Sequence, residues 1–306
     1  MGRYVLHRLA LALLTLGGVT VVIFLLIRLI PGDPARIIAG LLASDDEVRR
    51  LRVELGLTQP LYMQYLIFFT GLLHGNLGLS AATRAPVLEE IALRLRPTVL
   101  LAVSSIAVAT LVGLAAGIIS ATRRYSILDY LAMTLAVLGV SIPVFWLGLM
   151  LMLLFAVYLH WLPAGGYGTL ASFILPTIAL AAFSTGIIAR MTRSSLLETL
   201  SQDYVRTARA KGVPRHGVVL RHALKNALIP VLTVIGLQFG TLLGGAVLTE
   251  TTFAWPGMGR LLVNSILSRD YPVIQGIVLT FATMFAGVNL LVDLLYAYVD
   301  PRIHYG

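Results

Sequence analysis

Six long apolar runs recur along the chain and restrict what it can fold into. A helix needs about 20 apolar residues to cross the hydrocarbon core of a bilayer. Only 12% of the residues are charged, whereas a soluble domain carries about 25%. The sequence therefore predicts an all-α polytopic membrane protein with six transmembrane helices. The runs lie at roughly 9–30, 98–121, 128–158, 173–195, 229–249 and 273–297.

The positions of the positive charges indicate which loops are cytoplasmic. Arg3 precedes the first run, Arg123 and Arg124 follow the second, and a dense basic cluster occupies 193–225. The connector at 159–172 has no Lys or Arg. Because short cytoplasmic loops carry an excess of Lys and Arg, we expect both termini and the basic cluster on the cytoplasmic side. The same bias explains the net charge of +9, so no nucleic-acid partner is predicted.

The spans divide the chain into three expected parts. Residues 1–97 comprise the first transmembrane helix and an extracytoplasmic helical insert. Residues 98–298 form a five-helix membrane domain that contains a cytoplasmic loop at 196–228, and 299–306 is a cytoplasmic tail. The third run is long enough to contain a break, and Pro143 is the residue expected to cause it.

The insert at 31–97 carries its own helix signals. Ser44 precedes three consecutive acids, which is typical of a helix N-terminus, and Gly56 is expected to end that helix. The aromatic-rich segment after Pro60 is predicted to be an interfacial helix too short to span. Pro97 is expected to separate a further short helix from the second span. We expect a plain connector, with docking or gating on the outer face as the alternative.

The residue inventory does not predict a catalytic or metal site. All six histidines fall at span ends or in loops, and the chain has no cysteine and no H-E-x-x-H motif. A P-loop needs G-x-x-x-x-G-K-[ST], whereas the two lysines, Lys211 and Lys225, stand in AKG and LKN. We therefore expect no enzyme and no bound cofactor or metal. Any ATP would be hydrolysed by another polypeptide.

A few polar residues stand within or at the ends of the apolar runs. Glu250 and Asp293 are functional-site candidates by default, but both lie near a boundary, which favours structural roles. Thr233, Gln238 and Thr241 are candidates for lining a polar path near the centre of the fifth run, with helix–helix hydrogen bonding as the alternative. An ion-coupled secondary carrier would need charges at mid-depth, and such charges are not evident.

The basic loop predicts a short helix of its own. Ser201 and Asp203 favour a helix start, and Gly212 followed by Pro214 favours a stop. Its small side chains would let it lie in a groove of a partner, with Tyr204 and the next residue as anchors. The alternative is a solvated loop that serves topology alone. The predicted helix comprises Tyr204, Val205, Arg206, Thr207, Ala208, Arg209, Ala210, Lys211 and Gly212.

This loop resembles the EAA loop of the permease subunits of ABC importers. Arg206, Thr207 and Ala208 stand at the EAA positions and Gly212 at its glycine, but an arginine replaces the acid and Lys225 the usual proline. Both departures are similar to the dipeptide/oligopeptide, nickel and glutathione branch. Further similar stretches follow in that family's order along nearly the whole chain: LIPGDP (29–34), LGLTQPLYMQY (55–65), GNLGLS (75–80), TETTFAWPGMGRLL (249–262), RDYPVIQ (269–275) and DPRIHYG (300–306).

The resemblance implies a type I ABC importer permease in a prokaryotic inner membrane. It would form half of a pathway with a second homologous permease. Two ATPase subunits would bind ATP and Mg, and an extracytoplasmic solute-binding protein would deliver the substrate. The helix at 204–212 would couple to an ATPase. Trp255, Pro256 and Gly257 would form a turn at the outer mouth, against the binding protein. The expected substrate is a di- or oligopeptide, with glutathione or a nickel chelate as alternatives.

Overall fold

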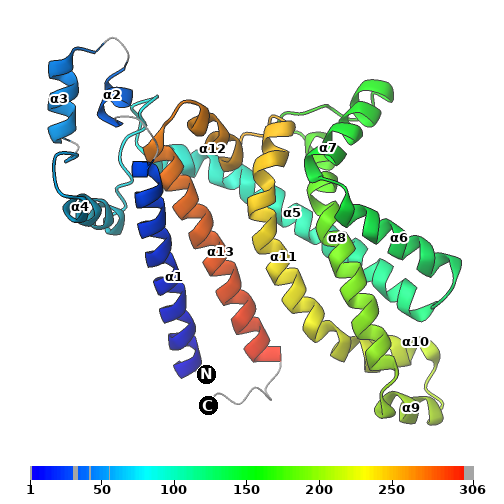
Figure 1. Ribbon diagram of the computed structural model, residues 1–306. Helices are drawn as coiled ribbons and strands as arrows, with labels where there is room; N and C mark the ends of the chain where they lie inside the picture. Colours follow the sequence, from blue (N-terminus) through cyan, green and yellow to red (C-terminus); the bar gives the residue numbers. More distant parts are fainter. Residues whose placement is uncertain (1, 30–33, 41–42, 55, 300–306) are drawn as a thin grey trace.

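The computed structural model describes residues 2–29, 34–40, 43–54 and 56–299, and nearly all of them are helical (Figure 1). The expected tail at 300–306 lies outside the described residues, as does most of the LIPGDP stretch. The predicted all-α class is confirmed.

Thirteen α-helices and two π-helical segments follow one another among the described residues. They are α1 (Gly2–Leu29), α2 (Pro34–Ala39), α3 (Asp45–Glu54), α4 (Leu61–Leu73), α5 (Val87–Thr122), α6 (Ile127–Ser141), α7 (Val144–Met152), η1 (Leu153–Tyr158), α8 (Leu170–Leu200), α9 (Asp203–Ala210), α10 (Arg215–Gly217), η2 (Val218–Ala223), α11 (Leu224–Thr252), α12 (Met258–Leu267) and α13 (Tyr271–Val299).

Five described helices are long and apolar enough to cross a membrane, and a bent pair brings the number to six. The bent pair is the third predicted span, in which α6 and α7 meet at an angle of 106°. The break falls at Ile142 and Pro143, as predicted. A proline ring biases the residue before it away from the helical conformation and removes a backbone donor, so the helix restarts in a new direction.

The two ends of the molecule carry different elements (Figure 1). The start of α1, the end of α13 and the short helices α9 and α10 lie at one end, and α2, α3 and α12 lie at the other. This arrangement agrees with the predicted orientation, since the basic loop and the chain ends share one side. Helices α1 and α13 lie side by side, while α8 packs between α5, α6 and α11.

Small residues allow α5 and α8 to approach closely. A Cβ at Gly117 would lie 2.7 Å from the backbone oxygen of Ala189 and 2.5 Å from Cβ of Thr192. One turn earlier, a Cβ at Gly113 would lie 2.8 Å from Ile188. Helices in a membrane associate largely through such close van der Waals packing, because lipid supplies no hydrophobic drive between them. The α5–α8 pair therefore forms the rigid centre of the domain.

The predicted helix break at Pro97 is wrong. Helix α5 runs without interruption through this proline, so the boundary expected at 97/98 falls inside a helix. Because proline has no N–H, the carbonyl of Leu93 loses the hydrogen bond that it would accept in a regular helix. Leu93 is 75% exposed, so this carbonyl is not sealed in the protein core and the lost hydrogen bond is tolerated. The carbonyl of Pro97 itself accepts a hydrogen bond from the indole of Trp255 at 3.1 Å.

The predicted helices of the insert are present. The backbone N–H of Ser44 donates to the Glu47 carboxylate at 2.8 Å, and the N–H of Glu47 donates to Ser44 Oγ at 3.3 Å, which is a capping box. These hydrogen bonds from Ser44 lower the pKa of Glu47. Gly56 follows α3 with φ of +66°. Helix α4 is joined to α1 by hydrogen bonds of 3.0 and 2.9 Å from the Arg28 guanidinium to Gln64 Oε1.

Candidate functional site

Helix α9 ends as its sequence predicts but begins differently. Gly212 has φ of +79°. Its N–H donates to the Arg209 carbonyl at 3.0 Å, and the Val213 N–H donates to the Ala208 carbonyl at 3.3 Å. These two bonds define a Schellman C-cap. Ser201, expected to start α9, instead donates from Oγ to the Glu198 carbonyl at the end of α8.

One face of α9 is committed to its own chain. Val205 is fully buried and Ala208 is 8% exposed, and both join an apolar cluster with Leu196 and Val218. Tyr204 accepts a hydrogen bond of 2.7 Å from the Asn226 amide. Val205 therefore anchors α9 to the rest of its own chain and not to a partner. The expectation that Ala208 lets α9 lie in a partner's groove is wrong, because this side chain points inward.

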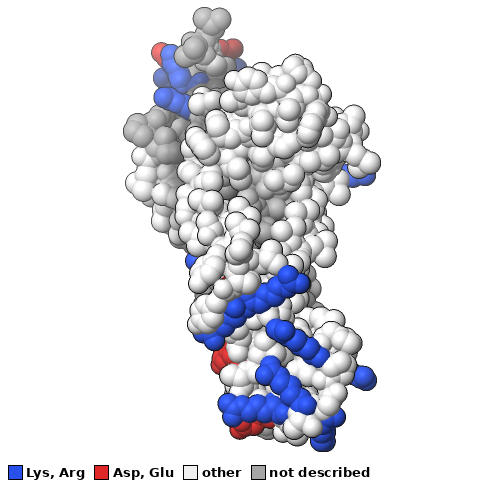
Figure 2. Space-filling model, turned by 90° about the vertical axis from the view of Figure 1, so that its right-hand side faces the viewer, with Lys and Arg blue, Asp and Glu red and all other residues white. Residues whose placement is uncertain are grey.

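The other face of α9 is exposed and basic. Figure 2 shows Lys and Arg gathered over the lower end of the molecule, where α9 lies in Figure 1. The one ion pair described on this face, between Arg206 and Asp203 at 3.3 Å, is highly exposed and contributes little stability. A helix turns by about 100° per residue, which places Ala210 opposite the buried side. Besides Asp203, the exposed residues are Tyr204, Arg206, Thr207, Arg209, Ala210, Lys211 and Gly212.

The helix that follows α9 is continuous with the fifth span. Helix α10, the π-helical η2 and α11 form one run from Arg215 to Thr252. Pro230 lies inside the run. Because proline has no N–H, the backbone carbonyl of Asn226 has no intrahelical donor at that position. One turn away, Ser195 Oγ of α8 donates to the Ala227 carbonyl at 3.0 Å. Helix α9 packs on η2 through Val205 and Ala208, so a displacement of α9 can reach this run by side-chain contact as well as through the turn at 211–214.

A buried polar network joins α5, α6 and α8 next to the α9 cluster. Arg193 donates to both carboxylate oxygens of Asp129, at 2.8 and 2.9 Å. Ser120 Oγ and the backbone N–H of Tyr125 also donate to this carboxylate. The Asp129 side chain is 4% exposed and that of Arg193 is 26% exposed. The bidentate geometry makes the pair strong and directional.

This network was not predicted from the sequence. Its local signal was available, because Ser126 and Asp129 stand three residues apart at a helix start. The N–H of Asp129 donates to Ser126 Oγ at 3.3 Å, as in an N-cap. The partner Arg193 lies 64 residues further along the chain, so spacing alone could not reveal the pair.

The three path candidates have different surroundings. Gln238 is buried and its amide lies 3.4 Å from Ser184 Oγ of α8, which is the helix–helix role kept as the alternative. Thr233 and Thr241 direct their hydroxyls to the backbone of α11 itself. Of the three only Thr241 is exposed in the single chain. Their role in lining a path stays a prediction.

Glu250 is a structural residue at the outer end of α11. Its carboxylate is fully buried and accepts hydrogen bonds from Thr98 Oγ1 at 2.6 Å, Gly259 N–H at 2.7 Å and Arg260 N–H at 3.1 Å. It therefore caps the N-terminus of α12 and fastens it to α5. A Cβ at Gly257 would lie 2.2 Å from this carboxylate, so only glycine fits there.

The tryptophan of the outer turn is buried rather than presented to a partner. Trp255 is 0% exposed and meets Tyr167 and Phe173 edge to face at 4.9 and 4.5 Å. Gly257 is also buried, and only Pro256 of the three is exposed. A direct contact of Trp255 with a binding protein is therefore wrong for this conformation, because neighbouring aromatic rings enclose the indole.

Asp293 forms an ion pair with Arg8 of α1 at 3.0 Å. Arg8 is near the start of α1 and Asp293 near the end of α13, and these two helix ends lie at the end of the molecule that also carries α9 (Figure 1). This ion pair joins the first and last spans, which agrees with the structural role expected for Asp293. Within the described residues no group of three or more His, Cys, Asp and Glu could hold a metal ion.

Two family descriptions together match almost the whole chain. Residues 113–305 match the family "Binding-protein-dependent transport system inner membrane component", and residues 1–102 match its "membrane comp, N-term" counterpart. The chain belongs to this permease family.

Two relatives and two solved structures resemble the permease along most of its length. The "Glutathione transport system permease protein GsiC" of Escherichia coli O6:H1 is 48% identical over 305 residues, with 100% of both chains covered. The protein of the same name from Salmonella paratyphi A is 50% identical over the same coverage. The inward-facing "MetNI methionine ABC transporter" matches with a TM-score of 0.59 at 18% identity, over 69% of this chain and 96% of that one. An "amino acid ABC transporter with histidines" matches with 0.54 at 15% identity, over 76% and 98%.

These comparisons confirm the fold and the location of the permease. It is a multi-pass inner-membrane subunit with the type I ABC importer fold, and such a subunit implies ATPase and binding-protein partners. The first family match ends at residue 102 and the second begins at 113, and the domain boundary at 97/98 stays a prediction.

We expect the conformation of Gly212 to control the position of α9. No atom lies within 4 Å of a Cβ built there, so a substitution acts through backbone strain alone. Gly212→Val should destabilise the permease by about 1–2 kcal/mol, since a left-handed conformation is costly for L-residues. Gly212→Asn should cost less, because asparagine tolerates this conformation. Thermal melting in detergent measures both, and equal losses would contradict the assignment of the cap.

Proposed function

We propose that the permease forms half of an ATP-driven import pathway for glutathione or closely related short peptides. The observation that carries the substrate class is the pair of relatives named as glutathione permeases, at 48% and 50% identity over the full chain. This similarity favours glutathione, first considered as an alternative, over the di- or oligopeptide substrate.

The remaining parts of the importer are proposed from the geometry of the cytoplasmic end. The exposed face of α9 is the ATPase-coupling surface, because its buried face is fixed by Val205 and Ala208. Two partner ATPases bind and hydrolyse ATP, and a second homologous permease completes the pathway. Closure of the ATPases moves α9 and, through the continuous helix 215–252, reorients the spans between inward- and outward-open states.

A binding protein is proposed to deliver the substrate at the opposite end. The loop between α11 and α13 would meet it through exposed residues such as Pro256 and Arg260. Trp255 fixes this loop to α5, because its indole N–H donates a hydrogen bond to the Pro97 carbonyl.

The substrate proposal is tested by uptake of labelled glutathione into cells with and without this chain. We expect uptake to fall to background when the gene is deleted and to return when it is restored. Excess unlabelled glutathione should compete at least tenfold better than a dialanine peptide or a nickel chelate. Better competition by the dipeptide would overturn the proposed substrate.

The energy source is tested in the same cells. Depletion of ATP with the ion gradient maintained should stop uptake, because the proposed importer uses ATP directly. An ionophore that collapses the gradient while ATP is maintained should leave most uptake intact. The reverse pattern would favour an ion-coupled secondary carrier. Equal amounts of tagged permease in the membrane provide the control for both measurements.

A further inference from the structure

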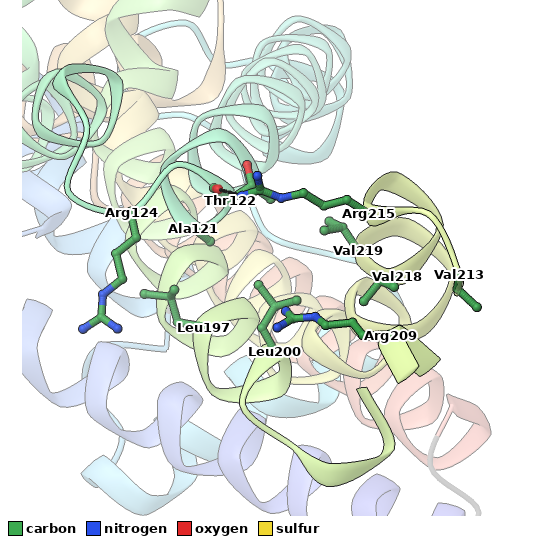
Figure 3. A pocket seen from close by; sticks show the side chains of 10 residues that line it. All are labelled: Ala121, Thr122, Arg124, Leu197, Leu200, Arg209, Val213, Arg215, Val218 and Val219. Carbon is green, nitrogen blue, oxygen red and sulfur yellow. Dashed lines mark hydrogen bonds between the residues drawn. The ribbon is translucent and has the colours of Figure 1, made fainter. Parts of the chain in front are cut away.

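A hollow of about 510 Å³ lies between the cytoplasmic ends of α5 and α8 and the segment that follows α9 (Figure 3). Its floor is apolar, with Leu197 and Leu200 from α8 and Val218 and Val219 from η2. These valines are buried, while the two leucines are partly exposed toward the hollow. The site thus offers apolar contact area at the edge of the membrane.

Three arginines surround this floor. Figure 3 shows Arg124 on one side of the α8 leucines, with Arg209 and Arg215 on the other. Arg215 Nη2 donates to the Thr122 carbonyl at 2.6 Å, which fixes this guanidinium at the end of α5 and leaves its other N–H groups available. The ion pairs that the structure describes at this end use other arginines. No carboxylate lines the hollow among the described residues, so its charge is positive.

The depth of the hollow relates it to the membrane. Thr122 is the last residue of the apolar helix α5, and Leu200 is the last residue of α8. The apolar floor therefore lies at the cytoplasmic ends of the two helices, with Leu197 and Leu200 just beyond the apolar run at 173–195, and the arginines lie at the same end. Long basic side chains favour this placement, because the stem contacts apolar surface while the charge reaches the interface.

We propose that this hollow binds the headgroup of an anionic phospholipid from the cytoplasmic leaflet. The phosphate lies against Arg124 and Arg209, and the glycerol and first methylene groups lie on the α8 leucines. Basic pockets between spans on the cytoplasmic side suit anionic headgroups. A free phosphate would make no use of the apolar floor. Arg209 also belongs to the exposed face of α9, so an acidic segment of an ATPase is the competing occupant, and the comparison of the isolated permease with the complex distinguishes it from lipid.

The test is lipid binding to the delipidated importer complex, purified on a tag carried by this chain. Native mass spectrometry counts bound phosphatidylglycerol against phosphatidylcholine. We compare the wild type with Arg124→Ala combined with Arg209→Ala. The matched control is Arg206→Ala combined with Arg221→Ala, which removes the same charge from exposed arginines that do not line the hollow. All four side chains are exposed, so folding should be unaffected.

The expected result is a preference for phosphatidylglycerol of about tenfold or more, since each basic residue near a membrane surface contributes appreciably to anionic lipid binding. The first double variant loses this preference and the control keeps it. Equal loss in both variants would indicate a general effect of charge and overturn the site. Full displacement by inorganic phosphate would identify a free anion as the occupant. Binding to the isolated permease but not to the complex would show that an ATPase covers the hollow.

Discussion

Replacing Ala210 by tryptophan should abolish uptake while leaving the permease folded. Ala210 lies on the exposed face of α9, opposite the buried Val205 and Ala208. A small side chain at this position allows α9 to enter a groove of the ATPase. An indole is too large to be packed in such a groove without steric clashes. We expect uptake at the background level, with ATP hydrolysis no longer stimulated by substrate-loaded binding protein. Both are measured in proteoliposomes.

Ala208→Trp provides the contrast, since it places the same side chain on the buried face. Ala208 contacts the cluster of Leu196 and Val218, where the added volume has no room. This variant should lower the melting temperature, whereas Ala210→Trp should leave it unchanged. Leu220→Trp, at an exposed and already bulky position, should change neither property. Full uptake by the Ala210→Trp variant would contradict the assignment of α9 as the coupling helix.

Replacing Asp129 by alanine should cause the largest loss of stability among single changes at the cytoplasmic end. The substitution removes the acceptor of both Arg193 hydrogen bonds and leaves the guanidinium without its counter-charge. Breaking a buried ion pair by removing one partner costs about 3–5 kcal/mol. The partial exposure of Arg193 favours the lower end, about 3 kcal/mol. We expect the melting temperature to fall by roughly 5 °C or more.

Asp203→Ala is the matched control, because it removes an aspartate from another ion pair at the same end. The side chains of Asp203 and Arg206 are 94% and 72% exposed, so this change should cost less than about 1 kcal/mol. Asp129→Asn should fall between the two, since an amide can still accept hydrogen bonds from Ser120 and Tyr125. If Asp129→Ala melts like Asp203→Ala, the network does not hold α6 against α8.

Local signals explain why much of the fold could be predicted. The apolar runs, the break at Pro143, the cap at Ser44 and the stop at Gly212 each depend on a few neighbouring residues. Pro97 shows where this reasoning fails. A proline usually ends a helix, but here the affected carbonyl is on an exposed face and α12 packs beside the helix. The tertiary surroundings therefore decided the outcome.

The candidate site was predictable in position but not in orientation. Spacing placed a short helix before Gly212, whereas the buried cluster determined that Ala208 faces inward and Ala210 outward. Asp129 and Arg193 meet only because α6 folds back along α8. Trp255 looked available on an outer loop, yet aromatic rings from the preceding connector and α8 enclose it. Each of these contacts joins residues far apart in the sequence.

The continuous helix from Arg215 to Thr252 has a thermodynamic consequence. Asn226, which contacts Tyr204 of α9, and Glu250, which holds α12, lie about 36 Å apart along this run. Because both ends belong to one helical run, we expect the states that they favour to be coupled. Coupling between binding sites is reciprocal. If nucleotide on the ATPases changes the affinity of the outer surface for the binding protein by some factor, the binding protein must change nucleotide affinity by the same factor.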